Sequence, residues 1–580
     1  MTATTHGGDR VAEVLRASGV RALFTLCGGH ISPILTAARA HGIRVVDVRD
    51  EATAVFAADA TGRLTGIPGI AAVTAGPGLT NALTALRNAQ LAQSPLVLIA
   101  GAVPTALKGR GALQDIDQMA TVAPHVKHAG TVRRVRDLGP AMEEAITRAR
   151  SGVPGPVLIE CPVDLLYPES TVREWYGAAG GKGGSLADRA LSLYLKRHVE
   201  RMFAGAATAT APSVQPVVPP EPAASAVHRA AELLVRAERP LLLVGSQAVS
   251  LARETGAIAA SIASLGVPVY LSGMARGLLG RDHPLQLRQQ RRPALKEADL
   301  VVLAGVPCDF RLDYGRQLRR GAKRIAVNRS RREAKLNCRP TVLAEGDAGR
   351  FLLRLAEALP REVERWPAWR EALRSRDRER QREIEQQAGE HGEFVNPLRL
   401  CRAVEAALAD DALLVADGGD FVGTASYIVR PRTPLGWLDP GVFGTLGVGA
   451  GFGIGARIAH PDREVWILFG DGAVGWSLAE FDSLVRHGLP VIAVVGNDGG
   501  WTQIAREQVK LLGDDVGTVL GRTAYHEVVR GFGAEGILVR EEAELVPALE
   551  RARAVAREGR PVLVNVWLDR TGFREGSISI

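Results

Sequence analysis

Long apolar runs are missing from this sequence. No stretch of about 18 consecutive apolar residues occurs, so we expect no membrane-spanning helix. The opening segment MTATTHGGDR has neither the basic stretch nor the apolar core of a secretory signal. The sequence therefore predicts a chain that is not inserted in a membrane, and we expect it in the cytoplasm.

Cysteine is also scarce. The chain has 5 cysteines, which are far apart and form no CxxC pair: Cys27, Cys161, Cys308, Cys338 and Cys401. This spacing argues against a zinc ribbon and against a disulfide framework, and it suits a reducing compartment.

Aromatic residues make up only 5% of the chain, and acidic residues (63) are slightly outnumbered by basic ones (71). The two signs of charge are interspersed, and no surface that combines basic and aromatic residues is apparent. Nucleic acid is therefore not an expected partner. The net charge of +8 indicates a solvated basic surface or, as an alternative, a phosphate-bearing small substrate.

What the chain has in abundance is short apolar segments separated by helical patterns. In the first 168 residues such segments occur at 20–26, 45–48, 69–73 and 96–100. They lack the polar alternation of a strand with one wet face, which is typical of parallel strands buried on both faces. We expect an α/β fold of three consecutive doubly wound parallel-sheet domains, of which residues 1–168 form the first.

The domains that follow are separated by changes in composition. Residues 169–225, rich in Gly, Ala and Pro, are predicted to be a linker with one helix over 186–203. A second domain is predicted over 226–360, a charged connecting helix within 361–392, and a third domain over 393–580. Apolar segments predict strands in these two domains, at 240–244, 267–271, 300–304, 324–327, 413–416, 465–469 and 491–495.

Polar side chains follow two of the predicted strands in the third domain. Asp471 follows the strand over 465–469, within Gly470-Asp471-Gly472-Ala473, and Asn497 follows the strand over 491–495. The carboxyl ends of parallel strands form the ligand edge of an open sheet, so the two side-chain oxygens can converge there. Oxygen ligands of this kind suit Mg²⁺ with a bound phosphate. Taken alone, Gly470-Asp471-Gly472 also fits an ordinary turn after a strand.

A carboxylate stands at the equivalent place in the first domain. Glu51 follows the apolar segment 45–48 and opens a helical pattern. A side chain there can serve as a general base, and the alternative is a helix-start residue that is favoured by the helix dipole.

The spacing of 26 positions from Asp471 to Asn497 resembles the diphosphate motif of thiamine-diphosphate enzymes. That resemblance implies thiamine diphosphate as the cofactor and Mg²⁺ held by Asp471, Asn497 and the carbonyl of Gly499. It implies further cofactor contacts from Gly418, Gly419, Asp420, Gly444, Leu446, Gly470, Gly472 and Ala473. The family often has Asn-Asn where this chain has Gly496-Asn497, but this departure removes no ligand.

The first domain carries the other half of the resemblance. Arg49-Asp50-Glu51 resembles the R-H-E segment of the acetolactate synthase branch, which implies that Glu51 activates the cofactor. Residues 75–81 resemble the family's S-G-P-G-x-x-N loop, which ends in Asn81, and the resemblance implies cofactor contacts from Asn81, Gly28 and Gly29. Gly28-Gly29-His30 matches the substrate-side loop, and residues 111–114 match a stretch in which Gln114 would face the reacting carbonyl. The resemblance therefore implies Glu51, His30 and Gln114 as catalytic residues.

Within this superfamily, residues 87–93, 435–441, 496–503 and 570–577 resemble the 2-hydroxyacyl-CoA lyase branch. The resemblance implies cleavage of a 2-hydroxyacyl-CoA to formyl-CoA and an aldehyde or ketone. Candidates for contacting CoA are Arg288, Arg291, Arg292, Trp501 and Arg574. Two alternatives stay open, namely acetolactate synthase or another 2-keto acid decarboxylase or carboligase, and an inactive regulatory subunit.

The resemblance also bears on partners. In this family the cofactor lies between the first domain of one subunit and the third domain of another, which implies a homodimer or homotetramer. The central domain of relatives holds ADP or FAD in some cases, so either nucleotide is an expectation for residues 226–360.

Overall fold

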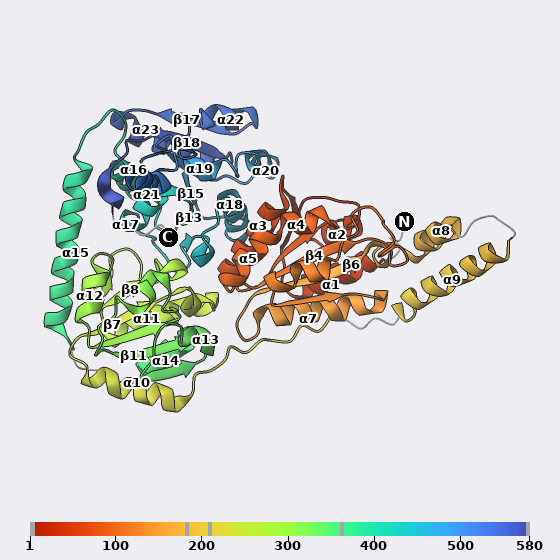
Figure 1. Cartoon of the computed structure of the whole chain (residues 1–580), viewed down its shortest axis with the longest axis horizontal. Coiled ribbons are helices and arrows are strands. Elements are labelled where there is room, and N and C mark those ends of the chain that lie inside the picture. The colour runs from red at the N-terminus through yellow and green to blue at the C-terminus, as the bar shows by residue number, and fades with distance from the viewer. Residues whose placement is uncertain (1–5, 180–184, 207–211, 360–364, 576–580) are drawn as a thin grey trace. The chain divides into compact units, whose positions relative to one another are not determined.

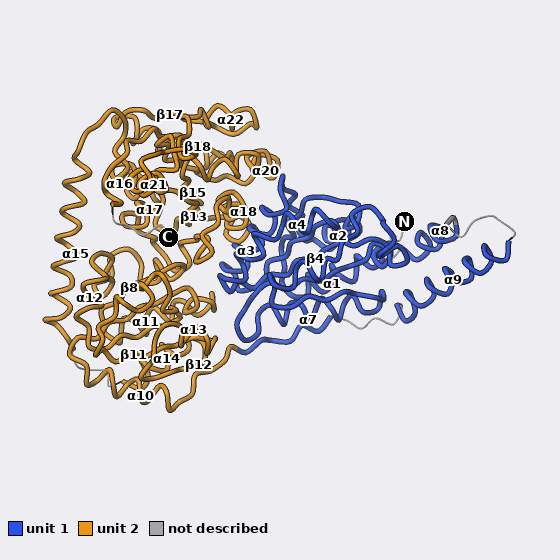
Figure 2. The backbone as a smooth tube through the Cα atoms, viewed as in Figure 1, with its two compact units in different colours: residues 1–218 blue, residues 219–580 orange. Residues whose placement is uncertain are grey.

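The structure is a computed structural model, and it describes residues 6–179, 185–206, 212–359 and 365–575. The chain divides into two compact units, residues 1–218 and residues 219–580, which Figure 2 shows in different colours. Each unit is described below by itself.

Unit 1 is built on one parallel six-stranded sheet with strand order β2-β1-β3-β4-β6-β5. Its strands are β1 (Ala22–Thr25), β2 (Arg44–Asp47), β3 (Gly69–Val73), β4 (Leu96–Ala102), β5 (His128–Thr131) and β6 (Pro156–Pro162). Its first seven helices are α1 (Gly7–Ala17), α2 (Ser32–Ala40), α3 (Glu51–Thr65), α4 (Pro77–Asn81), α5 (Leu83–Leu91), α6 (Gln118–Val122) and α7 (Leu138–Arg150). Every residue of β3, β4 and β6 is buried, as expected for strands covered on both faces.

The segment 169–225 differs from the prediction. Its described residues include α8 (Glu169–Ala179) as well as α9 (Leu186–Phe203), so the prediction of a linker with one helix is wrong. Val172 and Tyr176 from α8, together with Val199 and Met202 from α9, join the hydrophobic core of unit 1. The glycine-rich composition concealed α8, because its apolar residues are few and lie next to that stretch.

Unit 2 contains two further parallel sheets, each with six strands (Figure 1). The central sheet has the order β12-β11-β10-β7-β8-β9. Its strands are β7 (Pro240–Val244), β8 (Val269–Leu271), β9 (Gln286–Leu287), β10 (Leu300–Ala304), β11 (Lys323–Asn328) and β12 (Val342–Glu345). Its helices are α10 (Ala224–Arg236), α11 (Thr255–Leu265), α12 (Arg291–Glu297), α13 (Arg331–Ala334) and α14 (Ala348–Glu357).

The last sheet has the order β14-β13-β15-β16-β18-β17. Its strands are β13 (Leu413–Asp417), β14 (Trp437–Leu438), β15 (Val465–Gly470), β16 (Ile492–Asn497), β17 (Glu535–Val539) and β18 (Val562–Trp567). Its helices are α16 (Pro397–Ala407), α17 (Gly419–Ile428), α18 (Gly449–Ala459), α19 (Asp471–Val474), α20 (Glu480–Arg486), α21 (Thr502–Leu512), α22 (Tyr525–Gly531) and α23 (Leu545–Arg557). The predicted α/β class with three parallel sheets is confirmed.

The helix α15 (Pro367–Ala388) links the two sheets of unit 2 (Figure 1). Trp369 and Leu373, near its start, pack into the core of the central sheet. Ile384 and Ala388, near its end, pack into the core of the last sheet. One helix thus contributes to both cores. Among the described residues, no helix combines the length and the apolar character that crossing a membrane requires.

Candidate active site

Glu51 is the first residue of α3, the helix that follows β2, and the residue is only 6% exposed. Asp50 caps the helix, since its Oδ1 accepts a hydrogen bond from the Ala52 N–H at 2.6 Å. Asn81, at the end of α4, donates its Nδ2 to Glu51 Oε2 at 3.0 Å. The amide therefore occupies one carboxylate oxygen, and Oε1 is left for another partner.

The other predicted catalytic residues of unit 1, His30 and Gln114, lie against the turn after β3. His30 Nδ1 lies 3.0 Å from the hydroxyl oxygen of Thr74. A Cβ on Gly78 would lie 2.9 Å from Thr74 Cγ2 and 3.4 Å from Glu51 Oε1, so the turn runs between His30 and Glu51. Burial lowers the pKa of His30, which favours a neutral ring.

Glycines allow these close approaches. A Cβ on Gly28 would meet Thr74 at 2.4 Å, whereas Gly29 has open space around its Cα. Gly76 has a φ of +65°, and a Cβ there would lie 2.7 Å from the carbonyl oxygen of Gln114. Gln114 itself has a φ of +67°, an uncommon conformation for a residue with a side chain. The structure thus places Gln114 against the same turn.

Sequence reasoning missed the residue that ties this turn to the sheet. Gln118 accepts a hydrogen bond from the Gly76 N–H at 3.2 Å and donates to the Gly101 carbonyl at 3.1 Å. It also donates to Glu160 at 2.8 Å, and both Gln118 and Glu160 are buried. A lone glutamine in a short helix gives no signal in the sequence, so only the fold reveals this role.

In unit 2, Asp471 directly follows β15 and Asn497 is the last residue of the adjacent strand β16, so both lie at the same edge of the sheet, as expected. Asp471 Oδ1 accepts the Gly472 N–H at 2.8 Å, and Oδ2 accepts the Gly500 N–H at 3.0 Å. Burial raises the pKa of Asp471, and these backbone hydrogen bonds oppose that rise. The carboxylate is therefore held in place by the loop that follows Asn497.

The amide of Asn497 is fully buried and oriented. Its Nδ2 donates to Asn565 Oδ1 at 3.2 Å and to the Thr523 carbonyl at 3.3 Å. Its Oδ1 is buried without a hydrogen-bond partner in the described part of the chain. A buried oxygen without a donor is unfavourable by about 1–3 kcal/mol, and a hard cation would satisfy it. The donor set at Asp471 and Asn497 therefore fits Mg²⁺.

The third predicted ligand is already engaged. The carbonyl oxygen of Gly499 accepts the Leu520 N–H at 2.9 Å and Arg570 Nη2 at 3.1 Å. A carbonyl has two lone pairs, so ligation of a metal by Gly499 requires one of these donors to move. Gly499 lies in the expected place, but in this structure its oxygen is not available.

The predicted loop at Gly418, Gly419 and Asp420 lies against Gly470. The Gly470 N–H donates to the Gly418 carbonyl at 3.1 Å, and Gly418 has a φ of +59°. Asp420 Oδ1 forms an ion pair with Arg506 of α21 at 2.8 Å and lies 4.0 Å from Arg574 Nε. The two glycine loops and Arg574 are thereby brought to one end of the last sheet.

Leu446 packs against the loop at Gly418, and Trp501 packs against the loop at Gly472. A Cβ on Gly418 would lie 2.2 Å from Leu446 Cδ2, and a Cβ on Gly472 would lie 2.3 Å from the Trp501 ring. Gly444 has a φ of +65° and is exposed. Ala473 is buried in the first turn after Asp471. The absence of side chains at Gly418 and Gly472 is thus what allows the loops to pack against these two residues.

Sequence reasoning also missed Asp417, which holds the segment that carries Leu446. It is fully buried and accepts the N–H groups of Gly447 at 3.1 Å and Gly449 at 2.8 Å. Burial raises the pKa of Asp417 to about 7. The signal was present in the sequence, because Asp417 is a polar residue at the end of an apolar strand, as Asp471 is.

The three remaining CoA candidates lie elsewhere, in the central part of unit 2. Arg288 donates to the carbonyls of Tyr427 and Val429, each at 3.2 Å. Arg291 donates to the Arg311 carbonyl at 2.8 Å. Arg292 is exposed. No hydrogen bond or ion pair of the described residues joins these arginines to the loops around Asp471.

Comparison with known families identifies the class of protein. Residues 5–121 match the N-terminal TPP binding domain of thiamine pyrophosphate enzymes, residues 227–355 the central domain, and residues 417–566 the C-terminal TPP binding domain. The two TPP binding domains contain Glu51 and the Asp471–Asn497 pair respectively. The chain belongs to the thiamine pyrophosphate enzymes.

Individual relatives narrow the branch. The chain is 51% identical to "2-hydroxyacyl-CoA lyase 2" of Bos taurus, over 100% of this chain and 92% of the relative. It is 51% identical to the protein of the same name from Homo sapiens, over 99% of this chain and 92% of the relative. It is 36% identical to a "Probable acetolactate synthase" of Mycobacterium bovis, over 98% of this chain and 96% of that protein.

Proposed function

We propose that this chain is a carbon–carbon lyase that depends on thiamine diphosphate and Mg²⁺ and cleaves a 2-hydroxyacyl-CoA to formyl-CoA and an aldehyde or ketone. The observation that carries the proposal is the 51% identity, over essentially the whole chain, to relatives named 2-hydroxyacyl-CoA lyase 2. The arrangement around Glu51 and Asn497 supports it, because the side chains expected to face the cofactor are present and are held by hydrogen bonds.

The reaction needs no oxidant. The bond between C1 and C2 of the substrate breaks, the hydroxyl group on C2 loses its proton and becomes a carbonyl, and C1 gains one proton. Thiamine diphosphate, when bound, supplies a nucleophilic carbon and an electron sink for this cleavage. The protein must therefore supply a base for the hydroxyl, a proton for C1 and a site that excludes water.

Glu51 would hold or release a proton at Oε1, since Asn81 already engages Oε2. His30 uses Nδ1 for its contact with Thr74, so Nε2 is the nitrogen left for the substrate hydroxyl. A neutral ring suits a base, and burial keeps the pKa of His30 low. Gln114, held against the same turn, would orient the thioester carbonyl.

In unit 2, Asp471 and Asn497 would hold Mg²⁺, and the backbone at Gly470–Ala473 would face the diphosphate. Leu446 would contact the aminopyrimidine side of the cofactor. We further propose that the active enzyme is a homodimer or homotetramer located in the cytoplasm. ADP or FAD remains our expectation for the central sheet, to be checked by extracting the purified protein with acid and analysing released nucleotides.

The direct test is incubation with short linear and branched 2-hydroxyacyl-CoAs, with formyl-CoA and aldehyde measured by mass spectrometry. We expect formyl-CoA only when thiamine diphosphate and Mg²⁺ are both present. The 36% identity to a probable acetolactate synthase favours a second candidate reaction, condensation of 2-keto acids. Sustained acetolactate formation from pyruvate, without formyl-CoA from any 2-hydroxyacyl-CoA, would overturn the lyase proposal.

A further inference from the structure

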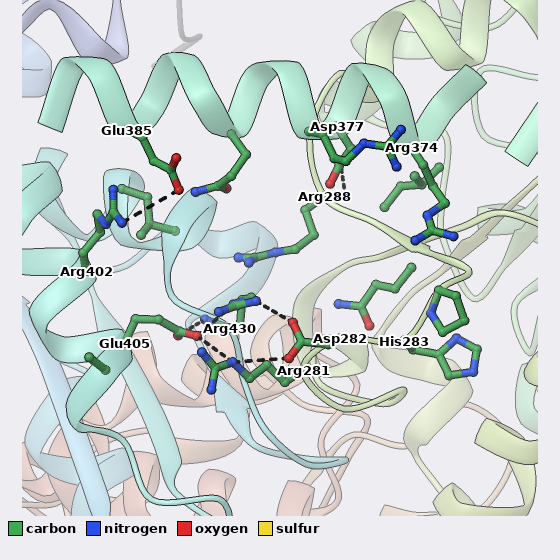
Figure 3. A pocket seen from close by; sticks show the side chains of 17 residues that line it. Arg281, Asp282, His283, Arg288, Arg374, Asp377, Glu385, Arg402, Glu405 and Arg430 are labelled. Carbon is green, nitrogen blue, oxygen red and sulfur yellow. Dashed lines mark hydrogen bonds and ion pairs between the residues drawn. The ribbon is translucent and has the colours of Figure 1, made fainter. Parts of the chain in front are cut away.

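A cavity of about 510 Å³ lies in unit 2, away from the loops around Asp471. It is formed by the segment before β9, by β9 itself, by one side of α15, and by residues of α16 and the end of α17 (Figure 3). This volume is within the range of sites for small molecules, roughly 300–1,000 Å³. The cavity has six lining arginines: Arg281, Arg288, Arg374, Arg378, Arg402 and Arg430.

Four carboxylates also line the cavity, but they neutralise mainly one side of it. Glu405 and Asp282 both bind Arg430, at 2.8 and 2.6 Å, and both lie near Arg281, at 3.4 and 3.5 Å. Figure 3 shows this group together at the side of the cavity opposite α15. These arginines are structural, because their charge is already balanced.

The other two carboxylates, Asp377 and Glu385, lie on α15. Glu385 pairs with Arg402 at 3.8 Å, and Asp377 is used by the backbone. Asp377 Oδ1 accepts the N–H groups of Arg288 and Gln289, at 2.9 and 2.6 Å. Among the described residues, the Arg288 guanidinium donates to main-chain carbonyls. Arg374 forms no hydrogen bond or ion pair there, and its charge acts on Glu371 only by helping to lower the pKa of that carboxyl. Burial, and then the nearby charges of Arg430 and Arg276, lower the pKa of Arg288 to about 10, while Glu405 and Asp377 oppose that fall.

The cavity also contains neutral hydrogen-bonding groups without a full set of partners. Gln286 Oε1 is buried and accepts no hydrogen bond in the described part of the chain. His283 Nδ1 accepts the Leu285 N–H at 3.3 Å, so in its neutral form the ring carries its proton on Nε2 and can donate there. A ligand that fits must offer anionic oxygens to the arginines and His283, and a donor such as a hydroxyl to Gln286.

We propose that this cavity binds a small phosphate ester, with its phosphate at Arg374 and Arg288 and a hydroxyl group at Gln286. Phosphate suits the arginines because the guanidinium group offers paired donors that match its oxygens. The residues come from the central sheet, from α15 and from the last sheet, so the ligand would bridge the two halves of unit 2. Binding of a free ester would make this site independent of the proposed lyase reaction, whereas binding of the 3′-phosphate of CoA would make it part of the substrate site of that proposed function.

Two sources share this chemistry, a free phosphorylated metabolite and the 3′-phosphate of CoA. Calorimetry on the full-length protein, with ribose 5-phosphate, inorganic phosphate, CoA and dephospho-CoA as probes, separates them. Binding of ribose 5-phosphate assigns the cavity to a free ester. Binding of CoA at least about tenfold tighter than dephospho-CoA, lost on changing Arg374, assigns it to the substrate's own 3′-phosphate.

The decisive variant is Arg374→Gln. We expect it to weaken binding of the phosphate ester about tenfold, the typical effect of losing one charge-assisted hydrogen bond. The matched control is Arg382→Gln, on the exposed side of the same helix and outside the cavity, which should leave binding unchanged. Equal weakening by both variants would mean attraction to a generally basic helix, and the proposal would then be abandoned, as it would if none of the four probes binds.

A second variant tests the hydroxyl contact. Gln286→Leu should weaken ribose 5-phosphate but leave inorganic phosphate unaffected, because only the ester can place a sugar hydroxyl at Gln286 while its phosphate lies at the arginines. Loss of both ligands to the same extent would contradict the assignment of Gln286. Lyase activity measured in parallel keeps the two proposals distinct, since the phosphate site can fail while cleavage of the 2-hydroxyacyl-CoA persists.

Discussion

The surroundings of Glu51 in unit 1 and of Asn497 in unit 2 differ in how completely their polar groups are paired. Around Glu51 and His30, Asn81 and Thr74 provide hydrogen-bond partners within the same unit. Around Asn497, two buried oxygens in the described chain, Asn497 Oδ1 and Asp498 Oδ1, have no hydrogen-bond partner. On the function proposed above, the first site would serve proton transfer, and the second would be completed by its ligand.

The difference in hydrogen-bond pairing is what the two proposed roles, general base and metal site, require. A general base needs a fixed position and one free oxygen, which Asn81 leaves on Glu51. A metal site needs oxygens that are not satisfied by the protein, and such oxygens are unfavourable until the cation binds. Stability should therefore respond to the cofactor mainly in unit 2, and catalysis should respond most to changes in unit 1.

The largest expected effect is on turnover in Glu51→Gln. The amide keeps the shape of the side chain but cannot exchange a proton, so we expect kcat to fall by about 100-fold to 10,000-fold. Steady-state formation of formyl-CoA measures this loss. Binding of thiamine diphosphate, followed by quenching of tryptophan fluorescence, should remain, and an unchanged kcat would remove Glu51 from the mechanism.

The next effect is on stability in Asn497→Ala. For the unchanged protein, thiamine diphosphate and Mg²⁺ at 100 times their Kd should stabilise the folded state by about 2.7 kcal/mol. Asn497→Ala should lose this increment, whereas Glu51→Gln should keep it. Hydrogen exchange of the backbone over 470–500, with and without the ligands, measures the effect where it arises. Equal losses in the two variants would contradict the distinction between the sites.

Much of this arrangement is predictable from the sequence, for physical reasons. The strands β3, β7 and β10 have the bounds that their apolar segments predict, because strands buried on both faces leave a continuous apolar run. Asp471 and Asn497 could be placed together, because parallel strands end at one edge of the sheet. Each of these predictions needed only the local pattern of residues along a strand and just after it.

Features that depend on two distant segments were not predictable. Nothing in the sequence links Gln118 to Gly76 and Glu160, or Arg570 to the carbonyl of Gly499. The helix α8 was missed because a weak apolar pattern is stabilised by packing against the core of unit 1. The same holds for the cavity beside α15, which is formed from parts of the chain more than 100 residues apart.

A smaller effect concerns pH. Burial raises the pKa of Asp417 from its ordinary value of 3.8 to about 7 in the folded state. The folded protein therefore binds the proton more tightly than the unfolded chain, so this contribution to stability is complete below about pH 3.8 and is lost as the pH rises through 7. The free energy of unfolding, measured by urea titration, should fall for this reason between pH 4 and 7.

Asp417→Asn provides the comparison, since the amide does not titrate. The difference in unfolding free energy between the variant and the unchanged protein should shift in favour of the variant as the pH rises. Other groups that titrate in this range, such as Asp498, are present in both proteins and cancel in the difference. A difference that stays constant from pH 4 to 8 would contradict a raised pKa at Asp417.

The smallest expected effect tests whether Arg570 weakens metal binding by the loop that follows Asn497. Arg570 donates to the carbonyls of Asp498 and Gly499 and carries a positive charge near Asp471. The engaged carbonyl oxygens and the positive charge both disfavour binding of a cation. Arg570→Gln should therefore raise the affinity of the protein for Mn²⁺, used in place of Mg²⁺, by roughly threefold. The change is modest because Arg570 is exposed and its charge is screened by solvent.

Electron paramagnetic resonance of free Mn²⁺ measures the change in affinity without reference to turnover. Arg551→Gln, on α23, is the control for a general change of charge. If Arg570→Gln instead weakens Mn²⁺ binding, the guanidinium positions the loop and does not compete with the metal. The site around Asn497 would then be arranged for its ligand in advance, as the site around Glu51 is.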